Sequence, residues 1–397
     1  MYVDEFFSRR SLIEVILFGL TIGMGMTWMS VAPLLPVITS ALKITTAEAG
    51  LLTALVPLCL AIASLLSAFI SDYISLKWIL LIGGWMMGIF SFLSGTAQNY
   101  QILLMYRMIA AFGAGFVFPN TAPVVIQWFS PKSQTILNAI NAVAPSVGIS
   151  IVLFSAPTIY SIMGWREAFF IFGAIQVIFA VLWSAFGKEN QASTATGKGM
   201  SLRALPKKET ILLGLNMFGV NMAFSAIGTF LPSYLVNERG YMLAEAGVMT
   251  SIITLTNILS GPLGGICTAR LGLRKPFLWG WGILTIVAGI GCVLLPNALL
   301  LPDFFLLGFG TAIAIGVLFT IPTELGVGEG AVRSMLSMIV FIGFLGAFIS
   351  PIIVGMMQMN DPGKSFNLGF LTFSLMASLT VFTGLLIKET GSRKKSS

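Results

Sequence analysis

The sequence contains no histidine, only three cysteines and little charge. Of its 397 residues, 9% are charged and 56% are hydrophobic, whereas a water-soluble surface needs roughly a quarter of its residues charged. A soluble enzyme or binding module of any fold is therefore excluded. The absence of histidine also excludes His-based triads and HExxH zinc sites. Since no Walker A pattern occurs, ATP hydrolysis by this chain is unsupported, and we expect no enzyme, no metal and no cofactor.

The few charges divide the chain into twelve apolar segments. Each is free of charge over at least 20 residues, and about 20 apolar residues are enough for a helix to cross ~30 Å of hydrocarbon. The segments are 15–42, 49–71, 78–106, 108–131, 133–165, 168–187, 210–237, 246–269, 276–302, 304–323, 334–360 and 365–387. The sequence therefore predicts an all-α polytopic membrane protein with twelve transmembrane helices. An outer-membrane barrel is excluded, because it needs alternating segments of ~10 residues.

The distribution of lysine and arginine predicts the orientation. If both termini are cytoplasmic, 17 of the 22 Lys and Arg residues face the cytoplasm, four face outside, and Arg107 lies within a span. This is a strong positive-inside bias. We therefore expect a monomer that crosses the cytoplasmic (inner) membrane many times, with membrane lipids around it. The net charge of +7 is then a topology signal, and nucleic acid is not expected as a partner.

The chain also shows an internal duplication. Residues 46–50 (TAEAG) recur as 243–247 (LAEAG), an offset of 197, and each copy opens an apolar segment. The predicted organisation is a six-helix half over 1–187, a cytoplasmic linker over 188–208, and a second six-helix half with a short basic tail over 209–397. Two six-helix repeats in the same orientation suit a carrier with one site between them.

Three short motifs carry a resemblance to a known family. The loop at 68–77 (AFISDYISLK) keeps the aspartate and the last cation of the pattern G-x-x-x-D-[RK]-x-G-[RK]-[RK], and 265–274 (GICTARLGLR) keeps its glycines and cations. Arg107 is followed by Gly113 and Gly115, as in the family's fourth helix. Over nearly its whole length the chain resembles the major facilitator superfamily of secondary transporters. The stretch 164–169 (GWREAF) is similar to its anion-carrying branches, including the cyanate- and nitrate-type porters.

Asp72 is the central residue of a predicted gate. A carboxylate at a helix C-terminus is unfavourable by ~0.3–1 kcal/mol unless a positive group compensates it. Lys77 is one candidate partner, and the start of the eleventh span near Arg333 is another; Arg270 and Arg274 occupy the corresponding loop of the second half. A contact that forms only when the halves close would act as a latch. The alternative is a solvated loop carboxylate.

Arg107 is the most informative single residue, because it is the one charge inside an otherwise continuous span. Intramembrane charges are costly and face a cavity or a partner. A guanidinium suits a carboxylate or another small oxyanion as substrate. Two alternatives remain open: Arg107 snorkels to the interface, or it ties its helix to the carbonyl groups of a neighbour.

The resemblance implies that spans 1, 4, 7 and 10 line a central cavity. The polar candidates on these spans are Thr27, Trp28, Asn120, Asn216, Asn221 and Thr311. Each of them is also explained by hydrogen bonds that hold helices together. Asp303, directly after Pro302, is the best candidate for coupling to a proton, although a place near a helix N-terminus explains it equally well.

The sequence as a whole favours a secondary transporter that moves a small-molecule substrate by alternating access. The favoured substrate is a small organic or inorganic anion contacted by Arg107, with or without a co-transported proton; uniport and exchange remain open. One alternative is an efflux carrier for drugs or lipids, and a second is a membrane receptor that transports nothing.

Overall fold

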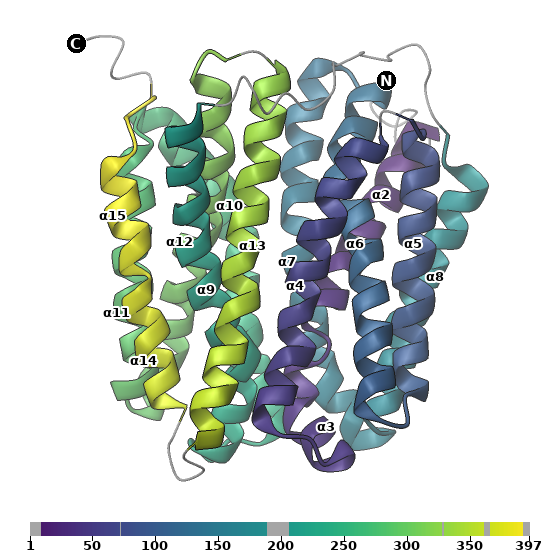
Figure 1. Ribbon diagram of the computed structural model, residues 1–397, viewed down its shortest axis with the longest axis vertical. Coiled ribbons are helices and arrows are strands. Elements are labelled where there is room, and N and C mark those ends of the chain that lie inside the picture. Colours follow the sequence, from purple (N-terminus) through teal and green to yellow (C-terminus); the bar gives the residue numbers. More distant parts are fainter. Residues whose placement is uncertain (1–8, 72, 189–205, 328, 361–365, 392–397) are drawn as a thin grey trace. The chain divides into compact units, whose positions relative to one another are not determined.

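The computed structural model describes residues 9–71, 73–188, 206–327, 329–360 and 366–391, and all regular structure within them is helical (Figure 1). The helices are α2 Arg9–Met29, η1 Ala32–Leu34, α3 Leu35–Leu42, α4 Thr46–Ile70, α5 Leu76–Leu93, η2 Ser94–Thr96, α6 Tyr100–Trp128, α7 Pro131–Ile162, α8 Trp165–Phe186, α9 Lys207–Asn237, α10 Leu243–Leu271, α11 Lys275–Leu294, α12 Asn297–Glu324, α13 Glu329–Asn360, α14 Asn367–Met376 and α15 Ser378–Leu386.

The expectation of twelve spans is confirmed. Twelve helical stretches of the described residues are long and apolar enough to cross a membrane, so the chain is a multi-pass membrane protein. Two spans are less regular than expected. The first passes from α2 through the 3-10 turn η1, which contains Pro33, into α3. The last divides at Ala377, whose N–H donates to the carbonyls of both Phe373 and Ser374. The helix α9 also begins at Lys207, slightly before the expected end of the linker.

Local turn chemistry sets the ends of several spans. The Asn99 side chain accepts a hydrogen bond at 2.9 Å from the backbone N–H of Ile102 and so caps α6. Gly164 joins α7 to α8 with a φ of 127°, which only glycine adopts without strain. Both positions lie in turns that the sequence marks with Asn and Gly.

The repeated motif folds in the same way in both copies. Glu48, near the start of α4, accepts a hydrogen bond at 2.8 Å from the backbone N–H of Thr45. Glu245, near the start of α10, accepts one at 2.9 Å from the N–H of Met242. In each case the glutamate reaches back three residues to cap its own helix. The similarity between 46–50 and 243–247 is therefore one of local structure as well as of sequence.

The helices pack into two compact units. The first comprises residues 1–30 and 59–197, and the second comprises residues 31–58 and 198–397. In the first unit α2 contacts α5, α6, α7 and α8 (Figure 1). Ile13, Ile16, Leu17 and Leu20 of α2 form its apolar core together with side chains of α5, α6 and α8.

The second unit is organised around α9, which contacts every helix from α10 to α15. The segment 31–58 belongs to this unit: η1 and α3 contact α9, and Gly50 of α4 lies against the backbone carbonyl of Pro351 in α13. The most hydrophobic windows of the spans containing α2 and α9 are 78% and 72% buried, more than those of any other span. These helices open the two sequence repeats, so their central positions agree with a duplication.

Candidate functional site

Arg107 lies in the second turn of α6 and is 1% exposed. Its Nη1 donates to Ser30 Oγ at 2.9 Å, and its Nη2 donates to the backbone carbonyls of Thr27 and, at 3.4 Å, Trp28. All three acceptors belong to the end of α2 or directly follow it, and all lie in the first unit. The guanidinium therefore binds the C-terminal end of a neighbouring helix.

The physical reason for this contact is the end of α2 at Met29. The last carbonyls of a helix lack partners within the helix and carry the negative end of its dipole. A planar guanidinium with five N–H donors satisfies several of them at once. The structure thus shows one of the two alternatives to substrate contact: Arg107 ties its helix to the carbonyl groups of a neighbour. The other alternative, snorkelling to the interface, does not fit a side chain that is 1% exposed.

Two features of Arg107 remain open to a ligand. Among the described residues the guanidinium forms no ion pair with a carboxylate. Its Nε–H is buried and has no hydrogen-bond partner there. Among the described residues the positive charge therefore meets only carbonyl and hydroxyl dipoles, and the Nε–H of the guanidinium has no acceptor.

Thr27 belongs to a buried polar cluster beside Arg107. Its hydroxyl donates to Gln176 Oε1 at 3.1 Å and lies 3.4 Å from Ser91 Oγ, which also donates to Gln176 Oε1 at 3.0 Å. The cluster joins α2, α5 and α8. Ser30, Ser91 and Gln176 were not among the sequence candidates, although each is a polar residue in a charge-free run, a signal that could have found them.

The structure thus brings Arg107, Thr27 and Trp28 together, but it places Asn120 apart from them. Asn120 Nδ2 donates to Ser67 Oγ of α4 and to the carbonyl of Phe116 at 2.7 Å. Its amide group therefore joins α6 to α4.

The three candidates of the second unit have different surroundings. Asn216 Nδ2 donates to the carbonyl of Thr380 at 2.8 Å and to Thr383 Oγ1 at 3.0 Å, which joins α9 to α15. Asn221 is 4% exposed, and its Nδ2 has no partner among the described residues. Thr311 bonds the carbonyl of Leu307 in its own helix at 3.0 Å. No hydrogen bond among the described residues joins any two of these three candidates.

The gate predicted around Asp72 falls partly outside the described residues, as do Asp72 itself and the side chain of Arg333. The Lys77 ammonium lies 5.8 Å from the ring centroid of Trp78. Arg270 is exposed and forms no ion pair with any described residue. The latch therefore stays a prediction.

Arg274 is the gate candidate with a defined partner. It forms an ion pair with Glu324 at 2.8 Å, and Thr390 Oγ1 donates to the same carboxylate at 2.6 Å. The backbone N–H groups of Arg274 and Lys275 donate to Glu389 at 2.8 and 3.1 Å. The loop between α10 and α11 is thereby fastened to the end of α12 and to the segment after α15.

Asp303 is buried, with 7% exposure, and its Oδ2 has no partner among the described residues. It lies in the second turn of α12, and the first turn carries no acidic residue, so stabilisation by the helix N-terminus does not explain its position. A Cβ atom added to Gly291 of α11 would lie 3.0 Å from Asp303 Cγ. The glycine makes room for the carboxyl group.

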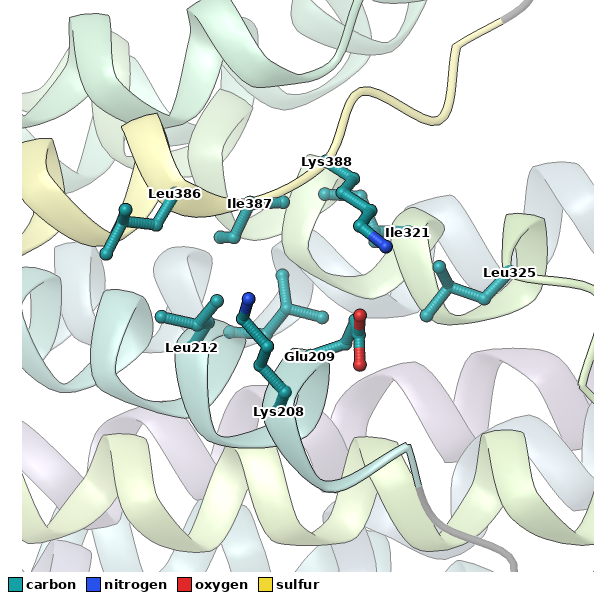
Figure 2. Close-up of a pocket in the computed structure, with 9 residues that line it drawn as sticks. Lys208, Glu209, Leu212, Ile321, Leu325, Leu386, Ile387 and Lys388 are labelled. Atoms are coloured by element: carbon teal, nitrogen blue, oxygen red, sulfur yellow. The ribbon is translucent and has the colours of Figure 1, made fainter.

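A pocket opens in the second unit, where α9 begins and α12 ends (Figure 2). It is lined by Lys208, Glu209, Leu212, Leu213, Ile321, Leu325, Leu386, Ile387 and Lys388. In Figure 2 its charged side chains come from the start of α9 and from the segment after α15. None of the candidate substrate residues lines it.

The family is decided by comparison with known proteins. The family model described as Major Facilitator Superfamily matches residues 17–351. The chain belongs to the major facilitator superfamily. The expectation from the loop and helix motifs is thereby confirmed, and this member of the superfamily is a membrane transporter.

Relatives of this superfamily member include two bacterial proteins with the name "Probable nitrate transporter NarT". The one from Staphylococcus haemolyticus is 24% identical over 367 residues, covering 92% of this chain and 94% of the relative. The one from Staphylococcus aureus is 24% identical over 375 residues, covering 94% and 95%.

Solved structures of other transporters confirm the twelve-helix fold. A bacterial homolog of the human lysosomal transporter Spinster, inward-facing and occupied, matches with a TM-score of 0.73 at 16% identity, covering 95% of this chain and 94% of that one. A mutant of the nucleoside transporter NupG matches with a TM-score of 0.77 at 14% identity, covering 96% and 100%. At these identities the match concerns the fold alone.

Proposed function

We propose that this protein is a secondary transporter of a small anion, with nitrate as the first substrate to test. It works by alternating access in the cytoplasmic membrane, with both termini in the cytoplasm. The observation that carries the proposal is Arg107, a buried guanidinium without a carboxylate partner among the described residues. Two relatives named as nitrate transporters and the excess of Lys and Arg on one side of the spans support it.

The electrostatic argument is simple. At an effective dielectric constant of about 20, two opposite unit charges ~4 Å apart attract by about 4 kcal/mol. The end of α2 supplies only partial negative charge, so an anion within reach of Nε gains much of this attraction. A cation or a neutral drug gains nothing from it. Loss of the charge should therefore weaken anion binding by about a hundredfold, which corresponds to ~2.7 kcal/mol.

The test is uptake of labelled anions into proteoliposomes, with wild type beside Arg107→Lys and Arg107→Ala. Wild type should move nitrate or another small anion. Arg107→Lys keeps the charge but loses the planar guanidinium, so it should transport with a raised KM. Arg107→Ala should raise KM by about a hundredfold, so that uptake at anion concentrations near the wild-type KM is almost lost.

Arg166→Ala is the matched control. That guanidinium lies 4.3 Å from the ring centroid of Trp165 and donates to the carbonyl of Ala97 at 3.3 Å, at the start of α8. Its loss should leave the anion KM unchanged. Transport of amphipathic drugs at equal rates by wild type and both Arg107 variants, with no anion moved, would instead establish the efflux carrier.

The proposed orientation has its own measurement. Reporter domains fused to the C-terminus, one fluorescent only in the cytoplasm and one active only outside it, should give signal from the first alone. The opposite result would reverse the assignment of both faces.

A further inference from the structure

Glu14 and Asn141 form a polar pair between α2 and α7. Asn141 Nδ2 donates to Glu14 Oε1 at 2.9 Å. The two other polar side-chain atoms of the pair, Glu14 Oε2 and Asn141 Oδ1, are buried and have no hydrogen-bond partner among the described residues. Both orphan atoms are oxygens, and they belong to the two groups that are already bonded to each other.

The protonation state of Glu14 decides whether these oxygens are satisfied. An ionised carboxylate only accepts hydrogen bonds, and an amide oxygen only accepts them too. Each of two buried acceptors that face no donor loses the hydrogen bonds that water would supply, which destabilises the ionised form. A carboxylic acid has one O–H, which Oε2 can donate to Asn141 Oδ1. One proton therefore completes a reciprocal acid–amide pair and satisfies both orphan atoms.

The packing of the two helices holds the pair in place. Further along the same interface, Gly25 of α2 lies against the backbone of Pro145, and Gly148 of α7 lies against the backbone of Ile22. Such close approach is possible because glycine has no Cβ. The neighbours Ile13, Ile16 and Leu17 of α2 belong to the apolar core, so the surroundings of the pair offer little solvation to a negative charge.

No cation among the described residues compensates Glu14 by an ion pair. The helices packed against α2 are α5, α6, α7 and α8. Successive spans alternate in direction, so one end of each of these helices lies at the same membrane face as Glu14. The cationic residues at that face are Arg9, Arg10, Lys77, Lys132 and Lys188. The Lys132 side chain is not among the described ones. At the other end are Tyr100, Tyr106, Arg107, Tyr160, Arg166 and Glu167. Arg107 is bonded to the far end of α2 and does not neutralise Glu14.

We propose that Glu14, paired with Asn141, is the site at which this transporter binds the co-transported proton. Glu14 lies about 8 Å from the start of α2, at 1.5 Å per residue, and its side chain is only partly buried. A proton adds to Oε2, and the acid O–H then donates to Asn141 Oδ1. Release of the proton leaves both oxygens as acceptors without a donor. The proposal rests on the proposed anion transport, because the proton would accompany the anion.

Infrared difference spectroscopy on the purified protein, titrated with acid, tests the site without any substrate. Wild type should show the C=O band of a protonated carboxylic acid, and Glu14→Gln should lose that band. Glu14→Asp should shift it, because the shorter acid cannot reach Asn141 in the same way. If the band is unchanged in both variants, or absent from wild type, the proposal is wrong.

Proteoliposomes test the coupling with labelled nitrate as the probe. Glu14→Gln preserves the reciprocal pair with an amide N–H in place of the acid O–H, so exchange of nitrate across the membrane at equal pH should persist. Accumulation driven by a pH gradient should be lost. The matched control is Glu245→Gln, which alters an exposed helix-capping carboxylate and should retain both activities. Full pH-driven accumulation by Glu14→Gln would overturn the proposal.

The two proposals fail in different ways. If wild type moves no anion but the acid band is present and lost in Glu14→Gln, the proton site stands and the proposed anion substrate is wrong. If nitrate is accumulated by wild type and by Glu14→Gln alike, the anion function stands and the proton site is wrong.

Discussion

Asn216 and Asn221 provide a matched test of which polar residues contact the substrate. Both are asparagines on α9, both are buried, and they are five residues apart, so at 3.6 residues per turn they lie on different faces of the helix. The amide of Asn216 bonds α15 twice, whereas Nδ2 of Asn221 has no acceptor among the described residues. We predict that Asn216→Ala damages stability and that Asn221→Ala damages transport.

The magnitudes follow from the hydrogen bonds. Each of the two bonds from Asn216 Nδ2 contributes about 0.5–1.5 kcal/mol, and interhelical bonds in membranes average about 0.6 kcal/mol. Removing both should lower the free energy of unfolding by ~1–2 kcal/mol, since the loss is partly offset by removal of the unpaired Oδ1. Asn221→Ala removes a buried donor without a partner, so its free energy of unfolding should stay within ~0.5 kcal/mol of wild type or rise.

Two measurements on the same preparations separate the roles. Unfolding in detergent by denaturant titration reports stability, and counterflow of the anion in proteoliposomes reports KM. We expect Asn216→Ala to be less stable with an unchanged KM, and Asn221→Ala to be as stable as wild type with a raised KM. The reasoning is refuted if Asn216→Ala raises KM at full stability, because Asn216 would then contact the substrate.

Three further predictions, two of them with a matched control, test separate parts of the structure. Gly148→Ala should destabilise the protein by more than about 1 kcal/mol, because its Cβ would meet the backbone of α2, whereas Gly265→Ala meets nothing within 4 Å and should be neutral or stabilising in the same unfolding assay. Arg274→Ala should cost about 1 kcal/mol by the same assay, as expected for the loss of a partly buried ion pair, and Arg270→Ala should cost nothing measurable. Asp303→Asn should retain pH-driven accumulation of the anion if Glu14 binds the proton. Loss of that accumulation in Asp303→Asn would indicate that Asp303 is the residue that couples transport to the proton.

The helical architecture was predictable because lipid imposes it. A backbone in hydrocarbon must bond within its own segment, so charge-free runs of sufficient length predict twelve spans, and the structure contains twelve. The breaks in the first and last spans were not predicted, because their sequences stay apolar through η1 and through Ala377. Hydropathy predicts that a segment is buried in lipid or protein, but it does not predict which N–H group each backbone carbonyl of the segment accepts from.

The candidate site was predictable in kind but less so in detail. Arg107 stood out because a charge within a span requires a partner, and the structure supplies backbone carbonyls at the end of α2. Gln176 was missed because an amide among apolar residues resembles any other packing residue until its neighbours are known. The orphan oxygens of Glu14 and Asn141 belong to a contact between α2 and α7, and no local pattern in either helix reveals that pairing.

The two proposals together predict how transport responds to membrane potential. When the interior is negative, a single anion that crosses alone costs about 2.3 kcal/mol per 100 mV to bring inside. This lowers the ratio of its inside to its outside concentration by about fiftyfold. One proton bound at Glu14 for each anion near Arg107 cancels that charge, so wild-type uptake driven by a pH gradient should not change when the potential is set with potassium and valinomycin. In Glu14→Gln the anion moves without the proton, and the same change of potential should alter its distribution. A wild type that responds to the potential as strongly as Glu14→Gln would show that no proton accompanies the anion.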